Sequence, residues 1–183
     1  MSRVILDLCA GTGAWSQPYV DAGYYVERYD LPQDVRLLRH QPYRRGRDEH
    51  GPVHGILAAP PCTVFSYARN RYEPTDEELR AALSVVDACL RAVMLYRPVW
   101  WALENPVNKL RRYLGPPRWT FRHWQYGDPA EKPTALWGTF EPPMFCVGQR
   151  TKPSTYKTKR QNADPKDAIT PAHFAQAFKE ANP

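Results

Sequence analysis

Three short apolar runs constrain the fold of this chain most, because each one ends abruptly in a segment whose residues can bind a ligand or react with it. They cover residues 4–8, 55–59 and 99–103. Short apolar runs bounded by breaks are typical of strands buried on both faces, as in a parallel sheet. Parallel strands bring their carboxyl ends to one sheet edge, where open α/β folds bind ligands. The sequence therefore predicts an α/β protein with its site at that edge.

The run at 4–8 leads into a turn over residues 9–16 that contains Gly11 and Gly13. Glycine lets a backbone turn tightly and approach a ligand without a Cβ in the way. The third glycine of the dinucleotide fingerprint is absent, because Ser16 stands at that position. Its absence counts against an NAD enzyme.

The next elements predict that the chain starts with a βαβ arrangement. We expect a short helix over 16–22 and a second strand over 24–29, with Asp30 at the carboxyl end of that strand. Nucleotide-binding folds commonly hold a ribose with an acid in this position. The pattern therefore predicts a ligand with a nucleoside portion.

The other two apolar runs are followed by a thiol and an acid. Residues 55–59 are followed by two prolines, which have no N–H to donate and so end the strand, and then by Cys62. Residues 99–103 are followed by Glu104. Taken singly, a free cysteine is more often a buried packing residue, and an acid at a strand end is more often a surface or capping group. Their shared sheet edge favours a functional pair.

The remaining segments predict helices and one edge of the sheet. Thr75 and Glu78 have capping-box spacing, which predicts a helix that ends at Pro98. Two strands over 120–126 and 134–140 are expected as an antiparallel pair at one edge. The apolar face of the long helix should comprise Leu79, Ala82, Leu83, Val86, Leu90, Val93 and Met94, and we assign Cys89 within this helix to packing.

The last part of the chain predicts a loop and a helix within the same domain. Residues 141–167 form a basic, proline-rich stretch without periodicity, which we interpret as a surface loop. Thr170 and Pro171 then have the pattern of a cap followed by a first-turn proline. No repeat and no second apolar core is evident, so residues 1–183 are interpreted as a single domain.

Composition narrows the class of partner. The chain has 25 Lys and Arg against 19 Asp and Glu, a net charge of +6, which favours a polyanion such as nucleic acid. Its four cysteines are far apart and predict neither a zinc site nor a disulfide framework. No run approaches the roughly 18 apolar residues of a membrane span, so we expect a cytoplasmic protein that does not bind a membrane.

Several of these segments, in this order, resemble motifs of the cytosine-C5 DNA methyltransferases. Asp7-Leu8-Cys9-Ala10-Gly11-Thr12-Gly13 is similar to their cofactor loop, and Pro61-Cys62-Thr63-Val64-Phe65-Ser66 to their nucleophile motif, with Thr63 in place of glutamine. Glu104-Asn105-Pro106 stands where the family has E-N-V. Residues 126–134 lie where it has Y-G-x-P-Q-x-R-x-R, with Lys132 and Thr134 in place of two arginines. The resemblance spans most of the chain, and its specific part is the cysteine and glutamate motifs.

The resemblance implies a Rossmann-like methyltransferase that uses S-adenosyl-L-methionine, with a mostly parallel, doubly wound sheet and an antiparallel edge. It implies methyl transfer to C5 of cytosine in DNA in a bacterial cell or phage-infected host. Cys62 would attack C6, Glu104 would hold the base, and Lys132 and Thr134 would support the site. The residues implied at the cofactor are Asp7, Cys9, Ala10, Gly11, Thr12, Gly13, Trp15, Asp30, Leu31, Asp34, Val35, Pro60 and Thr170.

The same resemblance points to DNA contacts without a recognition domain. Only about thirty residues lie between the last two motifs, too few for a separate domain. This implies either low sequence specificity or an accessory specificity protein. The expected DNA contacts are Ser66, Arg69, Arg71, Arg150, Lys152, Lys157, Lys159 and Arg160.

Three other interpretations of the sequence compete with this one. The same chemistry on RNA or on a free pyrimidine nucleotide stays open, as does an inactive remnant that still binds S-adenosyl-L-methionine or DNA, which the altered arginine motif suggests. An amino-group methyltransferase would need an acid or amide before the two prolines and an aromatic residue after them. Ala59 and Cys62 occupy those places, which argues against that class.

Overall fold

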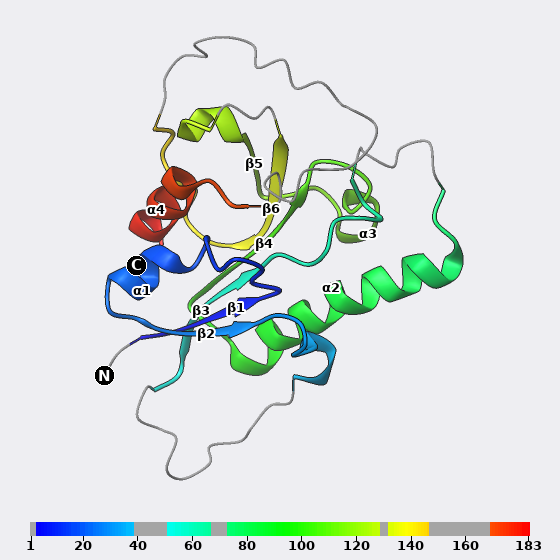
Figure 1. Ribbon diagram of the computed structural model, residues 1–183, viewed down its shortest axis with the longest axis horizontal. Coiled ribbons are helices and arrows are strands. Elements are labelled where there is room, and N and C mark those ends of the chain that lie inside the picture. Colours follow the sequence, from blue (N-terminus) through cyan, green and yellow to red (C-terminus); the bar gives the residue numbers. More distant parts are fainter. Residues whose placement is uncertain (1–2, 39–50, 67–72, 129–131, 147–168) are drawn as a thin grey trace.

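The computed structural model describes residues 3–38, 51–66, 73–128, 132–146 and 169–183, which form a six-stranded sheet of order β2-β1-β3-β4-β6-β5 (Figure 1). β1, β2, β3 and β4 are parallel, whereas β6 is antiparallel to both β4 and β5. The expected mostly parallel sheet with an antiparallel edge is therefore confirmed. The strands are β1 (Val4–Leu8), β2 (Tyr25–Tyr29), β3 (Val53–Ala58), β4 (Trp100–Pro106), β5 (Trp119–Arg122) and β6 (Pro133–Thr139).

Helices cover both faces of the sheet. The long α2 (Asp76–Tyr96) packs on one face, and α1 (Gln17–Asp21) and α4 (Ala172–Ala181) lie on the other (Figure 1). Successive strand residues point to opposite faces, so Leu6 and Leu8 of β1 join the core under α2, whereas Ile5 joins the core under α4. Both faces of the central strands are thus buried, which explains why they appear as continuous apolar runs.

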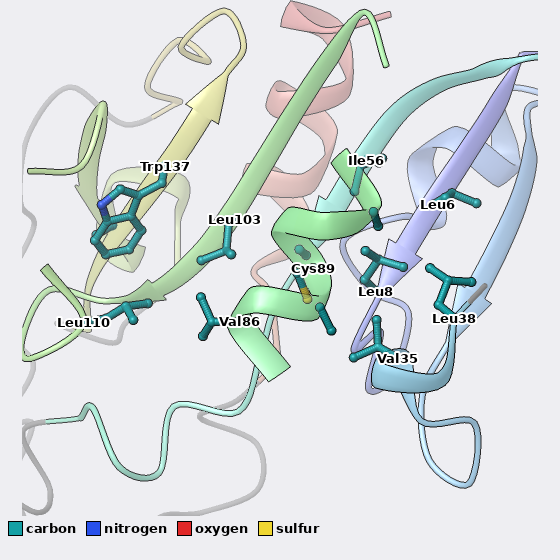
Figure 2. Packing of buried hydrophobic residues seen from close by; sticks show 14 of the residues in the cluster. Leu6, Leu8, Val35, Leu38, Ile56, Val86, Cys89, Leu103, Leu110 and Trp137 are labelled. Carbon is teal, nitrogen blue, oxygen red and sulfur yellow. The ribbon is translucent and has the colours of Figure 1, made fainter. Parts of the chain in front are cut away.

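The predicted capping box at the start of α2 is present, with Glu78 N–H donating to Thr75 Oγ1 and the Glu78 carboxylate accepting from Thr75 N–H. Cys89 is 1% exposed and packs against Leu8 and Ile56, so its assignment to packing is confirmed (Figure 2). Met94 was expected in the same face but is 76% exposed. The buried face is centred on Val86, Cys89 and Ala92, and at about 100° per residue Met94 falls on the opposite side.

The expected strand over 120–126 is wrong in its second half. β5 ends at Arg122, and a 3-10 helix, η3 (His123–Tyr126), follows. This turn buries the Tyr126 ring against Phe174 of α4, a contact between segments far apart in the sequence. Tertiary packing therefore overrides the strand propensity of the aromatic residues here.

Three further details differ from expectation. Two short helices were not predicted, η1 (Val35–Leu37) and α3 (Arg111–Leu114). α4 begins at Ala172 with Pro171 at its cap position and no side-chain cap, so Thr170 does not cap it. Within the described ranges, no helix combines the length and the apolar character needed to cross a membrane.

Candidate active site

The order of the sheet strands reverses between β1 and β3. From β1 the chain passes to β2 on one side and then returns to β3 on the other side. Doubly wound sheets bind ligands in the crevice outside the carboxyl ends of the strands at this point. The glycine-containing turn follows β1 and the Cys62 turn follows β3, so both segments lie at this point. Ala59 N–H donates to Leu8 O at 2.9 Å and holds the two strand ends together.

The turn after β1 has an unusual backbone. Cys9, Gly11 and Gly13 have positive φ angles of 58°, 53° and 72°. A Cβ added at Gly11 would meet open space, so a ligand can approach the backbone there, whereas a Cβ at Gly13 would lie 2.5 Å from the guanidinium carbon of Arg28. Glycine at position 13 therefore suits the positive φ, and a Cβ there would displace the Arg28 guanidinium from its place against the turn.

Arg28 of β2 closes this turn from the neighbouring strand. Its Nε donates to Ser16 Oγ at 3.0 Å, and its Nη2 donates to Gly13 O at 3.2 Å and to Gln17 Oε1 at 3.0 Å. Sequence reasoning did not single out Arg28. It also counted Ser16 only as a missing glycine, whereas the structure gives this hydroxyl a partner in the turn.

A buried acid lies beneath the same turn. Asp7 is 1% exposed, and its Oδ2 has no hydrogen-bond partner among the described residues. Burial raises the pKa of Asp7 to about 6, and Asp30 adds to this, whereas the hydrogen bond with Ser16 and the charge of Arg28 oppose it. The turn therefore contains an acceptor that a ligand's N–H or ammonium group can satisfy.

The residues after β2 divide between the surface and the core. Asp30 and Leu31 are exposed, Leu31 by 83%, beside the turn that Ala10 N–H anchors to Tyr29 O at 3.1 Å. Asp34 caps η1 and pairs with Arg36 at 2.6 Å, and Arg36 holds the pKa of this carboxyl below its usual range. Val35 is buried in the α2 core (Figure 2).

Two other predicted cofactor residues lie toward α4. Trp15 is 3% exposed and packs edge-on against Phe178, with ring centroids 5.4 Å apart. Thr170 is half-buried just before α4. Their proposed contacts with a cofactor stay predictions.

The Cys62 thiol lies on a tight turn. Phe65 N–H and Ser66 N–H both donate to Cys62 O at 2.9 Å. Cys62 is partly buried, and burial together with the carboxyl of Glu104 raises the pKa of its thiol, whereas Lys132 lowers it. The thiol is therefore in the field of both an acid and a cation.

That acid and cation reach the site from adjacent antiparallel strands. Glu104 lies in β4, and Lys132 immediately precedes β6, which pairs Pro106 with Thr134. Lys132 Nζ is 3.8 Å from Glu104 Oε1, and the two side chains are 19% and 18% exposed. Burial raises the pKa of Glu104, and Lys132 opposes that rise. The structure thus brings together the thiol, acid and cation that the sequence placed in three separate motifs.

Two buried polar residues support this group. Thr134 is 1% exposed, and its Oγ1 donates to Lys132 O at 3.5 Å, so its hydroxyl contacts the backbone that bears the cation. Asn105 is fully buried, and its Nδ2 donates to Pro60 O at 3.0 Å. Asn105 was not among the predicted site residues, although an amide directly after Glu104 was a usable signal.

Most of the predicted DNA contacts are not covered by the structure. Ser66 is described and is half-buried at the end of the Cys62 turn. Outside the described residues lie Arg69, Arg71, Arg150, Lys152, Lys157, Lys159 and Arg160. In the described ranges no group of three or more His, Cys, Asp or Glu side chains has the arrangement of a metal site.

Comparison with known proteins gives a fold. No protein-family model matches the chain, and no curated protein matches its sequence. A solved structure of an E. coli prophage protein, described as a presumptive DNA modification methyltransferase, matches with a TM-score of 0.54 and 18% identity. The match covers 75% of this chain and 47% of that protein, so this chain spans less than half of the neighbour's length. Together with the mixed sheet, this likeness identifies an α/β methyltransferase fold.

Proposed function

We propose that this chain transfers a methyl group from S-adenosyl-L-methionine to C5 of cytosine in DNA. The observation that carries the proposal is the group of Cys62, Glu104 and Lys132, gathered beside the glycine turn at the point where the sheet order reverses. The structural neighbour's description as a DNA modification methyltransferase supports the same class of reaction.

Glu104 would hold the base. Its raised pKa favours a protonated carboxyl, which donates to cytosine N3 while its second oxygen accepts from the exocyclic amine. Thymine and uracil carry a proton on N3 and a carbonyl in place of the amine, so they oppose the same carboxyl at both positions. Glu104 would therefore select cytosine as well as stabilise the charge that develops on the ring.

Cys62 would act as the nucleophile. A thiolate attacking C6 would form a carbon–sulfur bond and move electron density to C5. C5 would then accept the methyl group, and the donor's sulfonium would leave as the neutral thioether S-adenosyl-L-homocysteine. Loss of the C5 proton to water would break the carbon–sulfur bond and restore the thiolate. The Glu104 carboxylate raises the pKa of the Cys62 thiol only while that carboxylate is charged, whereas Lys132 lowers the pKa of the thiol. A proton on Glu104 therefore serves two purposes, because it binds the base and makes the thiolate easier to form.

The turn after β1 fits the cofactor. When bound, S-adenosyl-L-methionine supplies an activated methyl group. Gly11 leaves open space for it, Asp7 Oδ2 offers a buried acceptor for its ammonium, and Asp30 lies exposed at the end of β2 where a ribose is commonly held. Arg28 keeps the backbone of this turn in place.

The test is to incubate the protein and S-adenosyl-L-methionine with cytosine-containing DNA, RNA and deoxycytidine monophosphate, and to quantify 5-methylcytosine by mass spectrometry. We expect product from DNA only, and none from Cys62→Ser. The matched control is Cys146→Ser, which removes an exposed free thiol outside the group of Cys62, Glu104 and Lys132. Product from RNA or the nucleotide alone would replace DNA as the substrate, and intact cofactor binding without product from any substrate would contradict the activity.

A second experiment identifies the nucleophile directly. A DNA duplex with 5-fluorocytosine cannot release its C5 substituent as a proton, so the enzyme should stay covalently attached through Cys62. Peptide mapping of the adduct gives the residue. An adduct on Cys9 or Cys146 would show that the nucleophile has been misassigned.

A further inference from the structure

A strongly basic segment immediately follows the acid-bearing strand and has no role in the site described above. Residues 109–122 contain Lys109, Arg111, Arg112, Arg118 and Arg122, and no acidic residue. They comprise α3, a connecting turn and β5. A segment with this charge attracts a polyanion, provided that its cations are accessible.

This segment is fixed to the Cys62 turn. Lys109 N–H donates to Phe65 O at 3.2 Å, and the Tyr113 ring packs edge-on against the Phe65 ring with centroids 6.2 Å apart. Figure 1 shows α3 just beyond β4, beside the segment that follows β3. α3 is therefore held in place next to the nucleophile.

The cations of the segment differ in accessibility. Lys109 is 8% exposed, with its Nζ 3.9 Å from Glu73 Oε1, and Arg118 donates to Phe140 O at 3.0 Å. Arg111 and Arg112 are both exposed, and neither forms an ion pair with a carboxylate of the described residues. Tyr113, next to them, is 45% exposed. α3 thus presents two adjacent guanidinium groups and an aromatic ring to solvent.

We infer that α3 is a second DNA-backbone contact, in which Arg111 and Arg112 bind the phosphates flanking the target cytosine. This rests on the proposed function, because it takes the base at Cys62 to belong to duplex DNA. Guanidinium groups bind phosphate oxygens through two parallel hydrogen bonds, which position a duplex without reading its sequence. A contact on a fixed element beside the nucleophile would hold the duplex while the base leaves the stack.

The test measures affinity for a cytosine-containing DNA duplex as a function of salt, by fluorescence anisotropy, for wild type and R111Q/R112Q. Losing two phosphate contacts should lower the slope of log affinity against log salt by about 2. When the salt concentration rises from about 50 to about 200 mM, the resulting loss of affinity should be about tenfold smaller for the variant than for wild type. R111K/R112K, which keeps the charge, should recover most of the slope.

The matched control is R3Q/R97N, which removes two exposed cations that precede β1 and β4 at the opposite edge of the sheet. Asparagine suits the left-handed backbone of position 97, where φ is 47°. Equal weakening by the control and by R111Q/R112Q, an unchanged slope in R111Q/R112Q, or an effect seen only with duplex RNA would overturn the inference. Thermal unfolding of each variant confirms that it folds.

The two proposals fail in different ways. If wild type makes no 5-methylcytosine yet binds duplex DNA with a slope that depends on Arg111 and Arg112, the methyl-transfer proposal fails and the contact surface stands. If wild type methylates DNA and R111Q/R112Q binds and methylates normally, the reverse holds.

Discussion

The turns after β1 and β3 lie side by side but are stabilised in different ways. The first is held by neutral and charge-assisted hydrogen bonds from Arg28 and Ser16 to a strained backbone. The second keeps the thiol of Cys62 between a carboxyl and an ammonium group that shift its pKa in opposite directions. In the proposed function, the first turn would bind the cofactor on a fixed backbone and the second would carry the proton chemistry.

The largest effect should come from Glu104→Gln at the second turn. The amide cannot be protonated as a carboxyl can, so we expect kcat to fall about 10²- to 10⁴-fold, the usual contribution of a positioned acid. Single-turnover methylation measures this loss. Affinity for S-adenosyl-L-methionine, measured by calorimetry, should stay unchanged, and a large loss of cofactor affinity would contradict the division between the turns.

At the first turn, the buried carboxyl of Asp7 should oppose folding as it ionises. Its pKa of about 6 in the folded state lies above the ordinary aspartate value of 3.8, so the folded state binds more protons between these values and stability falls as pH rises through them. The full effect is about 3 kcal/mol. Urea unfolding of Asp7→Asn should lack this decline. The exposed Asp87→Asn should keep it, and an equal decline in Asp7→Asn would refute the assignment.

A smaller effect is expected from Arg28→Ala. Removing the bonds to Ser16 and Gly13 should raise the dissociation constant for S-adenosyl-L-methionine about tenfold, or about 1.4 kcal/mol, with little change in kcat at saturating cofactor. Calorimetry and steady-state kinetics give the two quantities. Arg28→Lys keeps the charge but loses the planar guanidinium group with its several N–H donors, so it should recover only part of the affinity. A fall in kcat alone would place Arg28 with the second turn.

The smallest expected change is a shift of pH profile in Lys132→Met. Lys132 lowers the pKa of both Glu104 and Cys62, so its removal should move both limbs of the pH–rate profile toward higher pH. Lys132→Arg keeps the charge and should leave the profile close to that of wild type. A profile that moves to lower pH would mean that Lys132 does not act on these groups through its charge.

Sequence patterns predicted the sheet well because apolar runs and breaks are local signals. They placed β1, β3 and β4 correctly to within a few residues, and with them the edge where Cys62 and Glu104 meet. They failed at η3 and Met94, where contacts with α4 and the exact rotation of α2 decide the outcome. Such contacts join segments far apart in the chain, and no local pattern records them.

The site shows the same limit. Cys62, Glu104 and Lys132 were found through their motifs, and the structure brings these three side chains together. Arg28 and Asn105 were missed because their roles depend on which strand or turn lies beside them: Arg28 reaches across from β2, and Asn105 reaches the carbonyl of Pro60. Arg28 has no signature of its own in the sequence, whereas Asn105 follows Glu104 directly in the motif and could have been included.

The insertion of β6 between β4 and β5 has a consequence for the order of assembly. A growing chain would already contain Cys62 and Glu104 once β4 is complete, but Lys132 reaches them only when β6 pairs antiparallel with β4. Until then the thiol faces an acid without its cation. In sequence order, the last strand of the sheet is thus also the one that brings in the cation offsetting the acid beside the Cys62 thiol.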